Sequence, residues 1–348
     1  MITAIIFLIV LSVIVFVHEL GHFVMAKRAG MKVEEFGFGF PPRLWGHKPK
    51  NSETTYTINA IPFGGFVKIQ GEDGDDRTNQ RSFAKKGFWA RASVILAGVV
   101  MNVILAAALL AISNGIGSRI AVDRATIAKA TDIKIQITQI AKNSPAEKAG
   151  LQVFDEIKGF ESVEEVQSYI ARHKGQEMTL ALARGPVQVT PRLNPPTGEG
   201  ALGIALAKTG YVSYPWYEAI WRGIKEALAG LWFIATGFTM IIKNLFTTGK
   251  AGVELAGPIG IAVVTGQQAR LGFTYLLQFV AFISLNLAVI NVVPFPALDG
   301  GRLLFLVIEK IKGSPLPRRV ENGFNTVGFV LLLLLMFFIT AKDVLKFL

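Results

Sequence analysis

The segment His18-Glu19-Leu20-Gly21-His22 carries residue types at the spacing of a metal site. Residues four apart share one face of a helix, so both imidazoles can bind one ion. Glu19 lies one residue further round, where its carboxylate can reach a water molecule on that ion. Two core histidines are the alternative, but ionisable groups inside an apolar segment are costly and tend to mark function. The spacing therefore favours a metal ion held by His18 and His22.

A third ligand is expected, because catalytic zinc sites use three protein ligands and keep one position open for water. Asp299 is the carboxylate that flanks the other apolar runs at a similar depth. Pro294, Pro296 and two glycines interrupt the helix around it, and irregular backbone at membrane depth is tolerated where it lines a cavity. We predict Asp299 as the third ligand, with a helix cap as the alternative. For Asn291, a role in the site and a packing hydrogen bond both remain open.

The composition indicates that a membrane protein positions these residues. The chain has 348 residues, of which 51% are hydrophobic and 18% charged, whereas soluble domains carry about 25% charged residues. The absence of cysteine excludes disulfides, thiolate zinc sites and cysteine nucleophiles. The net charge of +11 is expected from basic cytoplasmic loops. Nucleic-acid binding is not expected, since no basic run is interleaved with aromatic residues.

Four apolar runs approach or reach the roughly 20 residues that cross a bilayer. They are residues 2–26, 92–112, 273–293 and 327–341, the last extended at its start by uncharged residues 322–326. The uncharged run 227–242 is shorter. If His22 and Asp299 share a metal ion, an even number of crossings must precede the third run, so residues 214–246 are predicted as an amphipathic interfacial helix. Basic residues after the first run and after Asp299 place both loops in the cytoplasm.

Residues 120–207 form a separate insert with alternating β-type runs and one helical segment. Its centre, Asn143 to Leu151, resembles a PDZ domain, in which a strand, a short Ser-Pro-Ala helix and a Gly-Asp-x-Ile turn follow in order. Phe154 stands where that turn usually has Gly. The resemblance implies a small α+β domain outside the membrane that binds a peptide or a C-terminus.

The order of these features resembles that of the site-2 proteases, the zinc intramembrane peptidases, and in particular the bacterial RseP-type branch that regulates sigma factors. The likeness covers nearly the whole chain, including residues 36–40, 61–68 and 257–261. One departure is Val99, where the family usually has Pro after Gly98. The resemblance implies roles for the residues already singled out: zinc ligands His18, His22 and Asp299, general base Glu19, and cleft residues Asn291, Pro294 and Pro296.

The loop after the first apolar run supplies candidate strands for holding a substrate extended. In residues 33–70, Phe36, Phe38 and Phe40 alternate with smaller or polar residues, and residues 56–61 form a second strand-like run before Pro62. Adding a substrate strand to a free edge would satisfy its backbone groups. Under this hypothesis, the substrate would contact Ile58, Ala60, Gly64 and Gly65. The alternative is an ordinary cytoplasmic hairpin with no role in substrate binding.

The sequence thus predicts a multi-pass α-helical membrane protein with four transmembrane helices, a PDZ-like insert and a membrane-associated β-hairpin loop. Its expected parts are residues 1–113, 120–207, 214–246 and 254–348. We expect a zinc endopeptidase of the cytoplasmic membrane, with the insert outside and the active site near the cytoplasmic side. Its partners would be the bilayer and single-span membrane proteins, such as anti-sigma factors or remnant signal peptides. A metal or proton transporter using the same cluster, and an inactive PDZ scaffold, are the alternatives.

Overall fold

The computed structural model describes residues 2–72, 78–123, 126–249 and 257–347. Two compact units emerge, which we call the helical unit (residues 1–113 and 216–348) and the insert unit (residues 114–215). The expected boundary at residue 254 lies outside the described residues.

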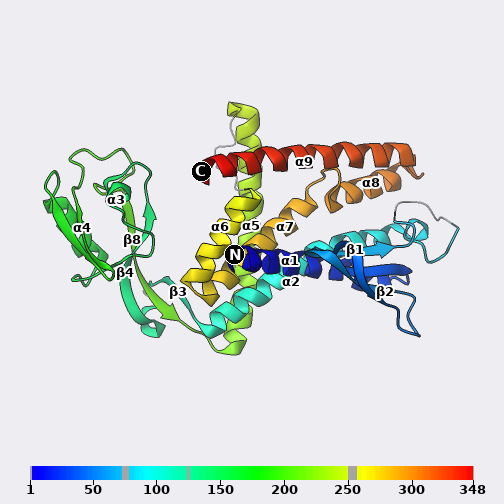
Figure 1. Ribbon diagram of the computed structural model, residues 1–348, viewed down its shortest axis with the longest axis horizontal. Helices are drawn as coiled ribbons and strands as arrows, with labels where there is room; N and C mark the ends of the chain where they lie inside the picture. The colour runs from blue at the N-terminus through cyan, green and yellow to red at the C-terminus, as the bar shows by residue number, and fades with distance from the viewer. Residues whose placement is uncertain (1, 73–77, 124–125, 250–256, 348) are drawn as a thin grey trace. The chain divides into compact units, whose positions relative to one another are not determined.

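Long helices dominate the helical unit (Figure 1). They are α1 (Ile2–Arg28), α2 (Phe88–Ile116), α5 (Trp216–Thr248), α6 (Pro258–Leu271), α7 (Phe273–Val292), α8 (Asp299–Lys312) and α9 (Arg318–Phe347). By length and composition, five helices in the described chain can cross a membrane, namely α1, α2, α5, α7 and α9. The chain is therefore a multi-pass membrane protein.

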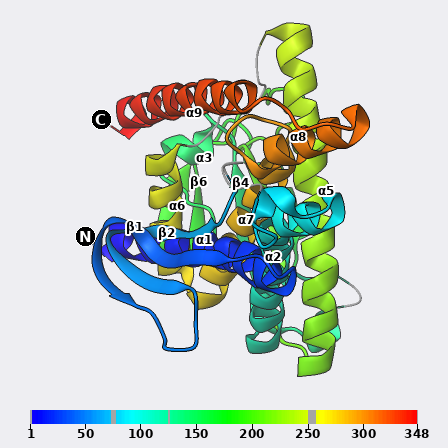
Figure 2. The same ribbon diagram turned by 90° about the vertical axis from the view of Figure 1, so that its right-hand side faces the viewer.

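Helix α5 is a fifth candidate span, whereas the parity argument predicted four crossings with this segment in the interface. The uncharged run 227–242 is only the middle of a continuous helix of 33 residues, because the flanking charged residues remain helical. By length and composition, α5 can therefore cross a membrane. In two views related by a quarter turn, however, α5 runs across the direction of α1 and α9 (Figure 1, Figure 2).

Small residues let the helices of this unit approach closely, as is common between membrane helices. Ala106 on α2, Ala227 on α5 and Ala281 on α7 meet in one buried cluster. Gly223 of α5 faces α2 so closely that a Cβ there would lie 2.6 Å from the Ala107 carbonyl oxygen. Helix α5 is consequently packed against two other helices along part of its length.

Strands β1 (Val33–His47) and β2 (Thr55–Ile69) are long and pair at more than one register. The first half of β1 pairs with residues 65–69, as in Val33 with Ile69, and also with residues 55–58, as in Phe38 with Ile58. The second half of β1 also pairs with residues 56–59. Residues 56–58 therefore have partners on both sides, and the prediction of a free edge there is wrong. In the described chain, the outer sides of residues 43–47 and 65–69 carry no paired strand.

The sheet is anchored to the middle of α1. Ser12 donates a hydrogen bond to the Pro62 carbonyl oxygen at 2.6 Å. Gly64, at φ +64°, approaches so closely that a Cβ would lie 2.4 Å from Val15. Because α1 is a membrane-crossing helix by length and composition, this part of β2 lies beside a membrane segment.

The insert unit is built on a six-stranded sheet in the order β3-β8-β4-β5-β6-β7. The strands are β3 (Ser118–Ala121), β4 (Thr131–Ile140), β5 (Glu156–Ile157), β6 (Met178–Leu182), β7 (Gly185–Val189) and β8 (Ile204–Val212). Helices α3 (Pro145–Lys148) and α4 (Val163–Arg172) begin after Ser144 and Ser162, whose hydroxyls accept hydrogen bonds from backbone N–H groups in the first turn. Ile137, Val166 and Leu180 lie in its own hydrophobic core. Phe154 adopts a left-handed backbone conformation with φ +74°.

Candidate metal centre

The two histidines lie on the buried stripe of α1. Val10, Ile14, His18, His22 and Ala26 recur every four residues and are all buried. They form a stripe that winds slowly around the helix, on which His18 and His22 are adjacent and face the same side. The Nε2 atoms of His18 and His22 are 3.1 Å apart. The spacing read from the sequence therefore brings both imidazoles to one point, as predicted.

Asp299 comes to the same point from the other end of the chain. It is the first residue of α8, and its Oδ2 atom lies 3.0 Å from His18 Nε2 and 3.3 Å from His22 Nε2. One ligand atom from each of the three residues lies within 4.8 Å of the other two. Among the described residues, this is the cluster that can hold a metal ion.

The donor set fits zinc. Asp299 Oδ2 is buried and has no hydrogen-bond partner in the described structure. In a tetrahedral zinc site with metal–ligand bonds of about 2.0–2.1 Å, neighbouring ligand atoms lie about 3.3 Å apart. The three separations between the ligand atoms here are 3.0, 3.1 and 3.3 Å, close to that distance. A buried acceptor facing two imidazole nitrogens is stabilised by a cation between them. Two histidines and a carboxylate are a ligand set of catalytic zinc sites.

Helix α2 holds the outer nitrogens of both rings, which sets the orientation of metal-binding histidines. His22 Nδ1 lies 2.8 Å from the Val94 carbonyl oxygen, so it donates a proton and leaves Nε2 free for a metal. The Asn102 side chain lies 3.3 Å from His18 Nδ1 and is fully buried. Ser284 of α7 donates a hydrogen bond to the Asn102 carbonyl oxygen at 2.9 Å.

Two glycines create the space in which the imidazoles lie. At Gly21, a Cβ would lie 2.4 Å from the Ala97 carbonyl oxygen, so the backbones of α1 and α2 are in close contact there. At Gly98 of α2, a Cβ would lie 2.6 Å from both His18 Cε1 and His22 Nε2. The sequence pattern did not identify Asn102 and Gly98 as site residues. A polar residue within an uncharged run was the available signal for Asn102.

Glu19 is half-buried on α1 beside the two ligands. It interacts electrostatically with His18, His22 and Asp299, and also with Glu72, which follows β2. A carboxylate next to a metal centre, but outside its set of ligand atoms, suits proton transfer.

The residues predicted to shape the substrate cleft lie at the end of α7 and in the loop that leads to α8. Asn291 is buried near the end of α7, and Pro294 and Pro296 lie in the irregular loop that leads to Asp299. Gly300 permits a close return of this loop, since a Cβ there would lie 2.2 Å from the Val293 carbonyl oxygen. These residues thus lie in the segment that presents the third ligand.

The four residues predicted to contact substrate in the sheet divide into two pairs. Ile58 and Ala60 are exposed, although the backbone of Ile58 is paired on both sides. Gly64 and Gly65 are buried, with Val15 and Phe16 of α1 as neighbours. The close backbone approach expected at the two glycines is therefore that of the chain's own helix.

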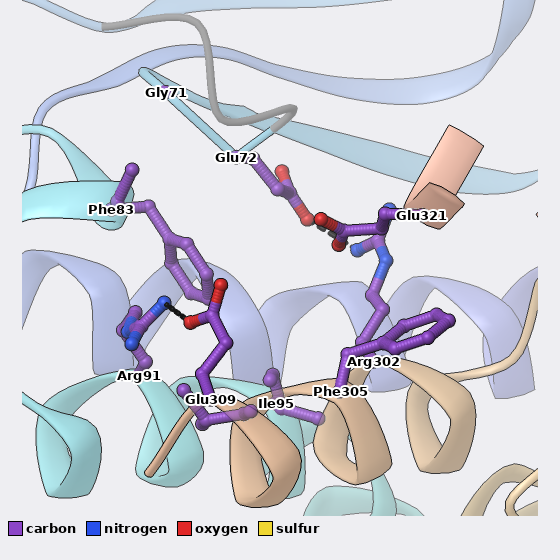
Figure 3. Close-up of a pocket in the computed structure, with 11 residues that line it drawn as sticks. Gly71, Glu72, Phe83, Arg91, Ile95, Arg302, Phe305, Glu309 and Glu321 are labelled. Carbon is purple, nitrogen blue, oxygen red and sulfur yellow. Dashed lines mark hydrogen bonds and ion pairs between the residues drawn. The ribbon is translucent and has the colours of Figure 1, made fainter. Parts of the chain in front are cut away.

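A pocket lined in part by charged side chains lies between the segment after β2, helix α2 and helix α8 (Figure 3). Its lining includes Ile95, which follows the Val94 carbonyl that holds His22, and Arg302, one turn beyond Asp299. Arg302 forms an ion pair with Glu72, and Arg91 forms one with Glu309 at 2.9 Å. The pocket lined by these ion pairs is therefore charged and hydrophilic, and not entirely apolar.

Comparisons with known proteins agree with this chemistry. A family model described as peptidase family M50 matches residues 6–335. A Clostridium perfringens relative is 34% identical over 347 residues, covering 97% of each chain. The zinc metalloprotease RasP of Oceanobacillus iheyensis is 30% identical over 441 aligned residues, covering 99% of each chain. RasP of Geobacillus kaustophilus is also 30% identical, over 434 residues, covering 98% of this chain and 97% of its own.

Proposed function

Because the chain belongs to peptidase family M50, the site-2 protease family, we propose that this zinc metalloprotease cuts the transmembrane segments of single-span membrane proteins. The observation that carries the proposal is the convergence of His18, His22 and Asp299 within 4.8 Å. Membership of the family favours this function over the transporter and the inactive scaffold. An intact Glu19 beside the ligands also argues against an inactive scaffold.

His18, His22 and Asp299 would hold the zinc ion. When bound, zinc polarises the scissile carbonyl and lowers the pKa of a bound water molecule towards about 7. Glu19 takes a proton from the attacking water and returns it to the leaving amine, since one positioned carboxylate can serve both steps. Val94 and Asn102 keep the imidazoles oriented while this happens.

A substrate helix hides its peptide bonds, so the protease must hold it extended. The outer edge of residues 65–69 is the better candidate for strand addition, because no described strand pairs there and the adjoining Gly64 packs on α1 near His18. The exposed side chains of Ile58 and Ala60 would contact substrate from the sheet. Asn291, Pro294 and Pro296 would line the opposite side of the cleft.

Water for the reaction enters through the polar pocket of Glu72, Arg91, Arg302 and Glu309. Ion pairs with partly exposed members attract water and give an aqueous route beside the ligands. Basic residues in the surrounding loops favour a cytoplasmic position for this pocket. The active site then faces the cytoplasmic side of the cell membrane.

The same orientation favours four crossings, with α5 in the outer interface. Its course across the direction of α1 and α9 supports this arrangement (Figure 1, Figure 2). Trp216, Trp221 and Trp232 are exposed on α5, and tryptophan is enriched at membrane interfaces. The insert would then lie outside the membrane as a PDZ-like domain that excludes substrates with bulky external domains. Anti-sigma factors and remnant signal peptides, once trimmed, fit this description.

The experiment compares the purified chain with Glu19→Gln. Single-span peptides are incubated with each protein, and zinc is measured by elemental analysis. We expect the variant to keep its zinc and lose about 10²–10⁴-fold in cleavage rate, the usual contribution of general acid–base catalysis. Cleavage at the wild-type rate by a zinc-loaded variant would refute the role of Glu19.

A further inference from the structure

In the loop that presents Asp299, one backbone N–H group finds its hydrogen-bond acceptor on another helix. Pro294 and Pro296 have no N–H group, and within the loop Phe295 N–H donates to Val293 and Leu298 N–H donates to Phe295. The N–H group of Ala297, two residues before Asp299, donates instead to Asn325 Oδ1 on α9 at 3.2 Å. Ala297 also has φ +67°, a conformation that non-glycine residues hold only when their surroundings enforce it.

A second residue of α9 contacts the same loop. Gly328 lies three residues after Asn325, on the same side of the helix. A Cβ at Gly328 would lie 2.1 Å from Pro296 Cβ and 2.9 Å from the Pro296 carbonyl carbon. The helix backbone thus rests directly on the residue before Ala297. Any side chain larger than hydrogen would push the loop away.

The remainder of α9 gives no other reason for a glycine at this position. Among the α9 residues whose side chains are described, only Gly328 and Asp343 are buried. Asp343 serves another contact, since it accepts a hydrogen bond from Gly260 N–H at 2.7 Å. The edge-to-face rings of Phe324 and Phe305, 5.0 Å apart, join α9 to α8 on the adjoining side.

We propose that Asn325 is a positioning residue which, together with the close approach at Gly328, holds the Pro296–Ala297 backbone so that Asp299 reaches the metal. The two histidines are oriented independently by α2, through Val94 and Asn102. Loss of the α9 contact therefore frees the third ligand and leaves the other two in place. The proposal rests on the proposed role of Asp299 as a zinc ligand.

The test measures zinc release from the full chain in lipid nanodiscs to a coloured chelator. Asn325→Leu removes the acceptor at similar volume, and Asn322→Leu makes the same change at an exposed position. Gly328→Ala adds the clashing methyl group, and Gly323→Ala adds it where no atom lies within 4 Å. We expect release to be about 10–100-fold faster in Asn325→Leu and Gly328→Ala, as for other partners of metal ligands, and unchanged in both controls.

A conservative variant and a spectrum separate positioning from general destabilisation. Asn325→Asp retains an acceptor oxygen and should release zinc at nearly the wild-type rate. Cobalt-loaded Asn325→Leu should show an altered visible spectrum, because one of three protein ligands is displaced. If Asn325→Leu does not fold, Gly328→Ala compared with Gly323→Ala decides the matter.

Wild-type release in both Asn325→Leu and Gly328→Ala would overturn the proposal. Asp299→Ala distinguishes this failure from that of the ligand assignment. If zinc is released fast from Asp299→Ala but at the normal rate from Asn325→Leu, Asp299 remains a ligand and only the positioning role of α9 is refuted. Normal release from Asp299→Ala removes the third ligand itself.

Discussion

The metal centre is made of two regions that hold their ligands by different means. His18 and His22 lie four residues apart on a regular helix. On the neighbouring helix α2, the Val94 carbonyl oxygen accepts a hydrogen bond from His22 Nδ1, and the Asn102 side chain faces His18 Nδ1. Asp299 follows an irregular loop with two prolines and a left-handed Ala297. The backbone of this loop is held partly by α9. The first region is organised by local geometry and the second by contacts between distant segments.

The difference bears on how each region tolerates change. A helix keeps its side-chain spacing through backbone hydrogen bonds that are independent of the side chains. An irregular loop keeps its shape only while its few partners remain. We therefore expect substitutions near the histidines to alter the space available to the imidazole rings or the orientation of the rings. Substitutions near Asp299 should instead shift the backbone that carries the carboxylate.

Removing the third ligand should have the largest effect on zinc. Asp299→Ala leaves two histidines, so zinc affinity should fall by more than the about 10–100-fold typical of an outer-shell change. Asp299→Asn should keep part of the affinity, because an amide oxygen is a weaker ligand. Zinc titration against a chelator of known affinity measures both. An unchanged affinity in Asp299→Ala would mean that another residue is the third ligand.

Filling the space beside the histidines should also be severe. In Gly98→Ala, the new methyl group would lie 2.6 Å from His22 Nε2, so one ring must leave its position. We expect loss of zinc and of cleavage in a protein that still folds. Gly87→Ala is the matched control, since nothing lies within 4 Å of its added Cβ. Normal zinc content in Gly98→Ala would show that α2 can move far enough to accommodate the methyl group, so that Gly98 is not required for the site.

A milder effect is expected from the partner of His18. Asn102→Leu removes the polar group 3.3 Å from His18 Nδ1, and such outer-shell changes cost about 10–100-fold in metal affinity. Asn102→Asp should restore affinity, because it offers an acceptor to a protonated Nδ1. Equal zinc affinity in the leucine and aspartate variants would argue that Asn102 only fills space.

The smallest effect on chemistry is expected from the insert unit. Ala121 of β3 pairs with Thr209 of β8, so a two-residue Asn-Gly turn can replace residues 122–208 and preserve the strand ends. Short single-span peptides should be cut at nearly the normal rate, because the metal centre is untouched. Substrates with intact external domains should now be cut without trimming. Gel assays of both substrate types measure this, and unchanged selectivity would argue against a filter.

The sequence predicted the helical half of the centre because its information is local. The His18 and His22 spacing needs only the helical repeat, and Asp299 followed from its depth and the broken helix around it. Gly98 and Asn325 were not predicted, since their roles depend on which segments meet. The pairing of residues 56–58 on both sides and the full length of α5 were missed for similar reasons. Strand partners are non-local, and charged residues flank the apolar core of α5.

X-ray absorption at the zinc edge tests the central claim most directly, because it reports the atoms bound to the ion. For the purified wild-type chain, we predict two imidazole nitrogens and carboxylate or water oxygens at about 2.0–2.1 Å. His18→Ala and His22→Ala should each remove one imidazole from that shell, and Asp299→Ala should remove the carboxylate oxygen. A shell that keeps both imidazoles in either histidine variant would contradict the assignment of the metal centre.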